Sequence, residues 1–371
     1  IDLDPEMGRA YAARAYARDE SALKQIALGG RQVWAGPLPE ALAGEVAERL
    51  SETYGRLDPS VWYAIWTARE AIAAAGWQDA EYGLNIGSSR GATHLWERYH
   101  DQFRDSASVS TPASPSTTLG NIASWVAHDL GCKGPALSHS ITCSSALHAV
   151  VNGCAWLQAG FASRFLAGGS EAPLTPFTLA QMEALKIYST HPGPLPCRPL
   201  DPDKPGNTFV LGEGAAMVCL EAGARPDALA LLSGFGYGTE PLQHGASLSA
   251  DGKCLQRSMR KALGDTDPAE VDAVVLHAPG TRKGDQAEVS AIESVFGDHR
   301  PQLFTNKWKI GHTLGASGLL SVELALLLLR ESPVRRPAYF KGDAGPRPCR
   351  YVLVNAVGFG GNAVSLLLER P

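Results

Sequence analysis

The chain has 371 residues, with 33 Lys and Arg against 38 Asp and Glu, and a formal net charge of −5 at pH 7. That length allows a large hydrophobic core without disulfides or a structural metal, and the mildly acidic balance gives no electrostatic reason to expect nucleic acid. The apolar run 324–329 is far shorter than the roughly 20 residues that span a bilayer, so we expect no membrane segment.

Seven cysteines are present, an odd number, and no two of them form a C-x-x-C pair. This spacing fits neither a zinc site nor a secreted disulfide framework. Most of these residues are therefore expected to be small core side chains in a reducing compartment, which predicts a cytoplasmic protein without a bound metal.

The first part of the chain is only partly regular. Residues 1–55 are expected to be helical or irregular, with no strand assigned. A helix is predicted from Asp58, an N-cap acid followed by proline, to the stop at Gly76. Residues 82–87 are expected to form a strand, and the Ser/Thr/Pro-rich stretch 105–118 a long loop.

From residue 136 on, short apolar segments alternate with helix-forming segments. The predicted strands are 136–142, 165–167, 215–220, 229–233, 271–276, 302–305, 351–354 and 363–368. The predicted helices are 143–157, 253–263, 284–296 and 313–330. Alternation of this kind is typical of an α/β fold with a largely parallel sheet.

A weak internal similarity links two of these units. The strand–turn–helix at 136–160 has Cys143 at its helix start, and that at 302–330 has His312 there. Each is followed by a short strand and a glycine pair. The similarity does not decide whether the fold is duplicated, but a duplication would place Cys143 and His312 at matching helix N-termini facing one site.

Cys143 stands in the run Ile-Thr-Cys-Ser-Ser-Ala, between a predicted strand and a predicted helix. Unpaired backbone N–H groups and the helix dipole favour negative charge there, which predicts a lowered thiol pKa and a thiolate nucleophile. The same N–H groups could bind a developing oxyanion. The alternative is a buried, inert cysteine, an interpretation that suits Cys154 on the same helix.

Two histidines are further candidates. His277 follows the apolar strand 271–276 and enters a Gly/Pro turn, where open α/β sheets place ligand-binding groups. His312 opens a helix, and an imidazole at a helix N-terminus stays neutral and can donate one N–H to an anionic oxygen. Either side chain could instead only cap a turn. The Gly-Phe-Gly-Gly turn at 358–361 is a weak signal by itself.

Taken in this order and spacing, these segments resemble the β-ketoacyl-ACP synthases, condensing enzymes of the thiolase-fold superfamily. The resemblance is carried by Cys143, His277, Lys307, His312, the turn 358–361, and the segments 167–172 and 197–221. It covers roughly residues 56–371 and implies an α/β, duplicated five-layer α-β-α-β-α fold with two mixed sheets. The half at 1–225 would carry the nucleophile, and the half at 226–371 the histidines.

The resemblance also implies a reaction. Cys143 would take an acyl chain from acyl carrier protein (ACP) as a thioester. His277 and His312 would promote decarboxylation of malonyl-ACP and stabilise the enolate. Lys307 would be the family's structural lysine, with Glu288 as its ion-pair partner. The product of this decarboxylative Claisen condensation would be β-ketoacyl-ACP, formed without metal or organic cofactor.

Other residues would bind the substrate. Backbone N–H groups of Cys143 and Phe359 would form the oxyanion hole, and the Phe359 ring would gate the acyl pocket. Thr281 would hold the pantetheine arm, Gly360 would contact substrate, and Lys204 would meet the phosphate or the acidic helix of the carrier. The family further implies a dimer, either of identical chains or with a chain-length-factor-like subunit.

The sequence departs from the family's pattern in three places. Ala278 and Pro279 replace the Gly-Thr of its His-Gly-Thr-x-Thr run, which removes one pantetheine hydroxyl contact. The opening strand with its Ser-Pro-Gly turn is not found near Ile1, and the Gly-Phe-Gly-Gly turn is one residue short, running directly into Asn362. These departures favour a specialised synthase of a secondary pathway, with the polyene and aryl-polyene ketosynthases as one candidate.

Other classes of protein remain as alternatives. A non-catalytic chain-length factor shares the fold but generally lacks the nucleophile. A CoA-dependent thiolase or acyltransferase would carry a second catalytic cysteine near the C-terminus, whereas Cys349 precedes the last strands. A Cys–His hydrolase would need a third orienting group and water at the acyl-enzyme, and a plain binding module would not need the catalytic set.

Overall fold

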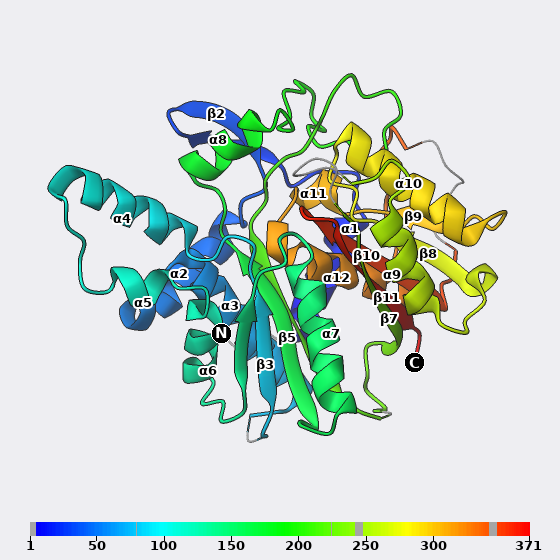
Figure 1. The fold of residues 1–371 in the computed structure, drawn as a ribbon, viewed down its shortest axis with the longest axis horizontal. Helices are drawn as coiled ribbons and strands as arrows, with labels where there is room; N and C mark the ends of the chain where they lie inside the picture. The colour runs from blue at the N-terminus through cyan, green and yellow to red at the C-terminus, as the bar shows by residue number, and fades with distance from the viewer. Residues whose placement is uncertain (1–4, 79, 224, 242–247, 341–346) are drawn as a thin grey trace.

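Two mixed β-sheets, each built from its own stretch of chain, form the centre of the molecule (Figure 1). The computed structural model describes residues 5–78, 80–223, 225–241, 248–340 and 347–371. The first sheet has the order β4-β3-β5-β6, made of Ala136–His139, Gly83–Gly87, Arg164–Glu171 and Gly214–Glu221. The second has the order β7-β11-β10-β8-β9, made of Leu231–Thr239, Asn362–Glu369, Tyr351–Gly358, Val271–Val275 and Gln302–Phe304.

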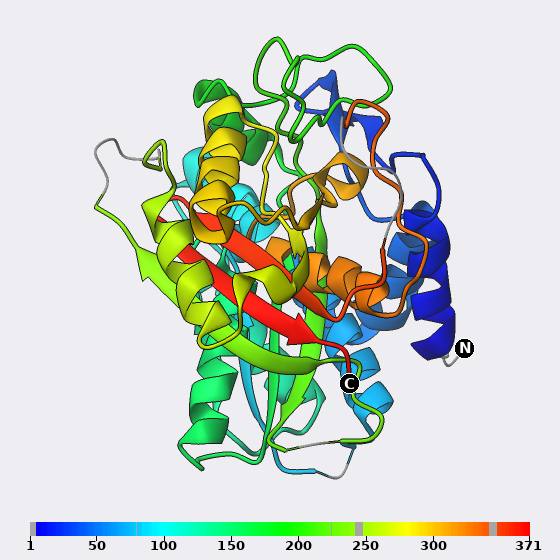
Figure 2. The same ribbon diagram turned by 90° about the vertical axis from the view of Figure 1, so that its right-hand side faces the viewer.

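Helices cover both sheets on both faces, so the fold has five layers. The outer helices of the first sheet are α3 (Pro59–Ala75) and α6 (Asn121–Asp129). The helices between the sheets are α7 (Ser145–Gln158) and α12 (Ser317–Leu329), and those outside the second sheet are α9 (Lys253–Leu263) and α10 (Arg282–Phe296). Figure 2 shows α9 and α10 in front of the second sheet. The expected five-layer α-β-α-β-α arrangement with two mixed sheets is confirmed.

Strand direction is more mixed than the alternation of segments predicts. Strands β3, β4 and β5 pair in parallel, as do β8, β9 and β10. The strands β6, β7 and β11 instead pair antiparallel with their neighbours. Each sheet therefore has a parallel part, which carries the helix connections, and an antiparallel edge.

The predicted boundaries of the elements match the observed ones best where the sequence carries strong capping signals. The Asp58 carboxylate accepts the N–H of Ser60 at 2.9 Å, and Gly76 ends α3 with a left-handed φ of +67°. Both ends of α3 are therefore set by the capping residues that predicted them. The helix predicted at 313–330 instead begins with a 3₁₀ turn, Leu314–Ala316, before α12.

Two predictions for the remaining chain are wrong. A strand pair, β1 (Lys24–Leu28) and β2 (Arg31–Ala35), lies within residues 1–55, where none was assigned. The stretch 105–118 is not a continuous loop, because it holds the end of α4 and all of α5. The other helices are α1 (Pro5–Tyr16), α2 (Glu40–Tyr54), α4 (Thr93–Ser106), α5 (Ala113–Thr117), α8 (Pro176–Ala184) and α11 (Lys307–Ile310), and a further 3₁₀ turn spans Pro268–Glu270.

The main core lies between the two sheets, around α7 and α12. Helix α12 is apolar on nearly every side because it has a sheet on each flank and α7 beside it, as expected of a helix buried all round. None of the helices in the described part of the chain combines the length and apolarity needed to cross a membrane.

Candidate active site

Cys143 lies in the tight turn between β4 and α7, and only 7% of its surface is exposed. The preceding residue, Thr142, has a left-handed φ of +49°, a conformation that costs on the order of 1–3 kcal/mol outside glycine. Ser145 holds this turn, because its hydroxyl donates to the Thr142 carbonyl at 2.6 Å and accepts the N–H of Ile141 at 2.9 Å. The strained turn presents Cys143 just ahead of the first turn of α7.

The thiol itself does not behave as predicted. Burial, reinforced by the carboxyl group of Glu171, raises the pKa of Cys143 to about 12. The positive charges of Arg90 and Lys307 act in the opposite direction but do not outweigh desolvation of the thiolate. The predicted lowering of this pKa is therefore wrong, and the resting group is a thiol that must lose its proton as it reacts.

This raised pKa predicts the pH dependence of Cys143 alkylation. The thiolate is the reactive form, so the rate of reaction with iodoacetamide should keep rising between about pH 7 and pH 10, without a plateau. Peptide mass mapping at each pH measures the rate, with Cys143→Ala as the blank. A plateau below about pH 8 would contradict the raised pKa and would support the prediction that the start of the helix lowers the pKa of Cys143.

His277 and His312 form a buried pair, with their Nε2 atoms 3.3 Å apart. The N–H of Leu314 donates to Nδ1 of His312 at 3.0 Å, which leaves the His312 proton on Nε2. Burial lowers the pKa of His277 to about 3 and that of His312 well below its ordinary value. Both imidazoles are thus neutral at neutral pH, and the Nε2–H of His312 is a donor that here faces Nε2 of His277.

Glu288 and Lys307 are buried but are not joined directly. The Glu288 carboxylate accepts the N–H of His277 at 3.0 Å and the following N–H at 2.7 Å. Lys307 donates to the Asn306 side-chain oxygen at 2.9 Å and to the Ser321 hydroxyl at 3.4 Å. The expected ion pair is therefore wrong for the described residues. Burial lowers the pKa of Lys307 to about 8, and the charge of Glu288 only partly opposes this.

The turn that contains Phe359 closes directly over the nucleophile. A Cβ added to Gly358 would lie 1.7 Å from the Thr142 hydroxyl oxygen and 3.1 Å from the N atom of Cys143. The Thr142 hydroxyl donates to the Phe359 carbonyl at 3.2 Å, and 41% of Phe359 is exposed. The backbone of this turn and that of Cys143 are therefore in contact, an arrangement in which both could face one oxyanion.

That close contact predicts a large effect of Gly358→Ala. The added methyl group collides with Thr142, so we expect a loss of about 1–3 kcal/mol in the free energy of unfolding and displacement of the turn from Cys143. Gly44→Ala is the control, because nothing lies within 4 Å of its added methyl group in α2; it should stabilise by about 0.5–1 kcal/mol. Urea unfolding measures both, and equal stability of the two variants would contradict the contact.

Thr281 and Gly360 lie in turns around the site. The Thr281 hydroxyl oxygen accepts the N–H of Gly284 at 3.3 Å and so caps α10. This bond uses the oxygen as acceptor and leaves the hydroxyl proton for another partner. Gly360 has a φ of +98°, which favours glycine. Their contacts with substrate remain predictions.

Lys204 has a different position from the one predicted. It is 6% exposed and forms an ion pair with Asp285 at the start of α10. The Asp285 carboxylate also accepts the N–H groups of Leu200 at 2.9 Å and Gly280 at 3.0 Å. A lysine buried in this way cannot meet a carrier protein at the surface, so the predicted carrier contact is wrong. Lys204 instead ties its own segment to α10.

Two side chains near the site were not singled out from the sequence. Phe209 stacks on His312 with ring centroids 5.1 Å apart, and Glu171, at the end of β5, is fully buried. Both stand in segments that carry the family resemblance. A buried carboxyl group at the end of a central strand is a recognisable signal, but its burial could not be read from the sequence.

Apolar side chains surround the nucleophile. One cluster joins Cys143 to residues of β2, α8, the segments that follow β5 and α8, and the turn after His312. Its buried members are Ala35, Cys143, Leu174, Leu179, Met182, Tyr188, Phe209, Leu211 and Leu314. Such a lining suits an acyl chain better than a polar substrate.

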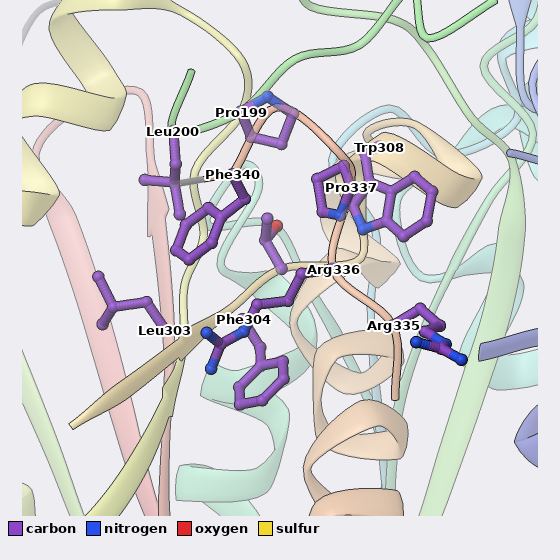
Figure 3. Close-up of a pocket in the computed structure, with 10 residues that line it drawn as sticks. Pro199, Leu200, Leu303, Phe304, Trp308, Arg335, Arg336, Pro337 and Phe340 are labelled. Carbon is purple, nitrogen blue, oxygen red and sulfur yellow. The ribbon is translucent and has the colours of Figure 1, made fainter. Parts of the chain in front are cut away.

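A separate small pocket lies where β9 and α11 meet the segment that follows α12 (Figure 3). Its lining residues are Pro199, Leu200, Leu303, Phe304, Thr305, Trp308, Arg335, Arg336, Pro337 and Phe340. The Arg336 guanidinium carbon is 4.4 Å from the Phe304 ring centroid and partly fills the space. Cys143 and the two histidines are not among the lining residues, so this pocket is separate from the candidate active site. The described residues also hold no group of three His, Cys, Asp or Glu side chains that could bind a metal ion.

Known proteins match most of the chain. Residues 19–225 match the family model for the beta-ketoacyl synthase N-terminal domain, and residues 229–338 match that for the C-terminal domain. The actinorhodin polyketide putative beta-ketoacyl synthase 1 of Streptomyces coelicolor is 30% identical over 353 residues, which cover 85% of this chain and 74% of that protein. The 3-oxoacyl-(acyl-carrier-protein) synthase 2 of Staphylococcus aureus is 29% identical over 348 residues, with 85% and 82% covered.

A solved structure shares the fold. The structure titled "The ishigamide ketosynthase/chain length factor" has a TM-score of 0.82 and 22% sequence identity, and covers 97% of this chain and 94% of that chain. The likeness shows the thiolase-like fold, while the two family matches and the 30% identity concern the sequence itself. Together they show that the chain belongs to the β-ketoacyl synthases, a family of acyltransferases.

Proposed function

We propose that the chain catalyses a decarboxylative Claisen condensation of an acyl group, held on Cys143, with malonyl-ACP. The observation that carries this proposal is the assembly around Cys143: a buried thiol in an apolar cluster, under the backbone of the Gly358 turn. The neutral pair of His277 and His312 is linked to that cluster through Phe209. Nucleophile, oxyanion donors and enolate donors are thus available in one place.

The first step is acyl transfer. The Cys143 sulfur attacks the thioester carbonyl of acyl-ACP, the bond from that carbon to the pantetheine sulfur breaks, and the carrier leaves as a thiol. Because the resting Cys143 is protonated, its proton has to pass to the departing sulfur, and a neutral imidazole can relay it. A sulfur nucleophile suits this step because it is also a good leaving group in the next one.

The second step makes the carbon–carbon bond. The bond between the α-carbon and the carboxylate of malonyl-ACP breaks, carbon dioxide leaves, and the electron pair remains as an enolate. An Nε2–H donor such as that of His312 stabilises the enolate oxygen. The enolate carbon attacks the Cys143 thioester, the tetrahedral intermediate expels the Cys143 sulfur, and one proton from solvent restores the thiol.

The partners and pathway follow from the relatives. The name of the staphylococcal relative includes an acyl carrier protein, which supports ACP as the partner. The shared fold with a ketosynthase/chain-length-factor pair supports a dimer of this fold, either with an identical chain or with a chain-length-factor-like subunit. A polyketide synthase and a 3-oxoacyl synthase match the chain at nearly equal identity, so identity favours neither pathway. We assign the chain to a specialised polyketide or polyene pathway because Ala278 and Pro279 depart from the family's sequence pattern. We expect it in the cytoplasm.

Intact-mass measurement with a panel of acyl-ACPs tests the proposal. The mass of the protein should rise by one acyl group, and the acyl group that gives the largest rise names the primer. Adding malonyl-ACP should then release carbon dioxide and produce β-ketoacyl-ACP. A protein that gains no acyl group from any carrier would refute a stand-alone synthase. Acylation that appears only after a chain-length-factor-like subunit is added would assign the heterodimer.

A further inference from the structure

Glu171 ends β5 as a fully buried carboxyl group that the proposed reaction does not use. Its Oε1 atom accepts the N–H of Gly315 at 3.1 Å and also the N–H of Ser89. Its Oε2 atom is buried and makes no hydrogen bond with any described residue. Burial raises the pKa of this carboxyl group to about 7, and a buried polar atom without a partner costs about 1–3 kcal/mol, so this side chain is expensive to keep in the core.

The backbone that Glu171 holds is the turn that orients His312. The N–H of Leu314 donates to Nδ1 of His312, and the next N–H, that of Gly315, donates to Glu171. Leu314 has a left-handed φ of +42°, which a leucine adopts only where its surroundings hold it. A Cβ on Gly315 would lie 2.6 Å from the Glu171 Oε1 atom, so the close approach needs glycine at this position.

We propose that Glu171 is a positioning residue that sets the tautomer of His312, by fixing through Gly315 the turn from which Leu314 donates to Nδ1. With that N–H in place, the His312 proton lies on Nε2, the atom that meets His277. Without it, the strained turn relaxes and the proton can move to Nδ1. The inference rests on the proposed function for its kinetic test but not for its spectroscopic one.

The two steps of the reaction separate this role from general stabilisation. Glu171 is one of the groups that raise the pKa of Cys143, so its removal should slow acyl transfer, in which an imidazole only relays a proton, less than it slows decarboxylation. We expect Glu171→Ala to lower malonyl-ACP decarboxylation by about tenfold or more, and Cys143 acylation by a clearly smaller factor. Glu171→Asp keeps the carboxyl group and most of the volume but withdraws the acceptor, and should show the same split. Glu171→Gln keeps an acceptor oxygen and should restore decarboxylation to within about threefold of the wild type.

Nitrogen NMR of ¹⁵N-histidine-labelled protein measures the tautomer directly. In the wild type, Nδ1 of His312 should show the signal of an unprotonated acceptor, and in Glu171→Ala and Glu171→Asp it should show a protonated fraction. Asp58→Asn is the matched control, since Asp58 is also fully buried and accepts two backbone N–H groups, from Ser60 and Leu95, at α3. It should change neither the tautomer nor the ratio of the two steps.

The outcomes are distinct. An unchanged His312 signal in Glu171→Ala and Glu171→Asp, or an equal loss of acylation and decarboxylation in both, would overturn the role of Glu171. A wild-type protein that neither acylates nor decarboxylates would instead refute the proposed function. In that case the NMR comparison would still decide the tautomer proposal.

Discussion

Replacing Cys143 with alanine should reduce acyl transfer from acyl-ACP to the protein by about 10⁴-fold or more, the scale on which nucleophile removal acts. The acyl group then has no sulfur to bond, whereas the histidine pair and the Gly358 turn keep their places. Decarboxylation of malonyl-ACP should therefore persist, without formation of β-ketoacyl-ACP. Intact mass measures the first effect, and carbon dioxide release measures the second.

Cys154→Ala is the matched control for this experiment. Cys154 stands on α7, is also buried, and has a pKa raised by burial to about 11, yet it is not part of the apolar cluster that holds Cys143. Its variant should acylate at nearly the wild-type rate. Acylation that survives in Cys143→Ala but disappears in Cys154→Ala would identify Cys154 as the nucleophile and would contradict the proposed mechanism.

Local sequence signals predicted the helices and strands whose ends or faces are set by a few nearby residues. They missed the elements that are set by contacts with distant parts of the chain. Helix α3 was predictable because Asp58 and Gly76 cap it, and α9 because its apolar positions recur along one face. The β1–β2 hairpin was missed although Gly29 and Gly30, both with positive φ, form the two-residue turn that signals one. Only Ala35 among its strand residues is buried, so the apolar alternation used to find strands is weak there.

The candidate site shows the same division. The order of Cys143, His277, His312 and the Gly-Phe turn identified the family, because motif spacing is a property of the sequence. The pKa of Cys143 could not be predicted in this way, since it depends on the side chains that bury the thiol. The ion pair of Lys204 with Asp285 could not be predicted either, because the two residues lie 81 positions apart along the chain.

Replacing His312 with alanine should lower malonyl-ACP decarboxylation by about 10²–10³-fold, the usual cost of one donor to a developing oxyanion. His312 is the member of the pair whose tautomer the structure fixes, because the Leu314 N–H occupies Nδ1. The variant should still accept an acyl group on Cys143, although more slowly if this imidazole relays the thiol proton. Single-turnover measurement of each step separates the two effects.

The control for this variant is His148→Gln. His148 stands on α7 one turn after Ser144, and burial lowers its pKa to about 4, but it contacts the Ser144 carbonyl rather than His277. A loss of decarboxylation in His148→Gln equal to that in His312→Ala would show that neutral histidines in this part of the fold act through stability. If only His312→Ala loses decarboxylation, the effect belongs to the Nε2–H at the pair. That conclusion requires the pair to be neutral in the assay. The pKa of His277 is about 3, so protonation of His277 cannot account for a loss of the decarboxylation rate above about pH 5.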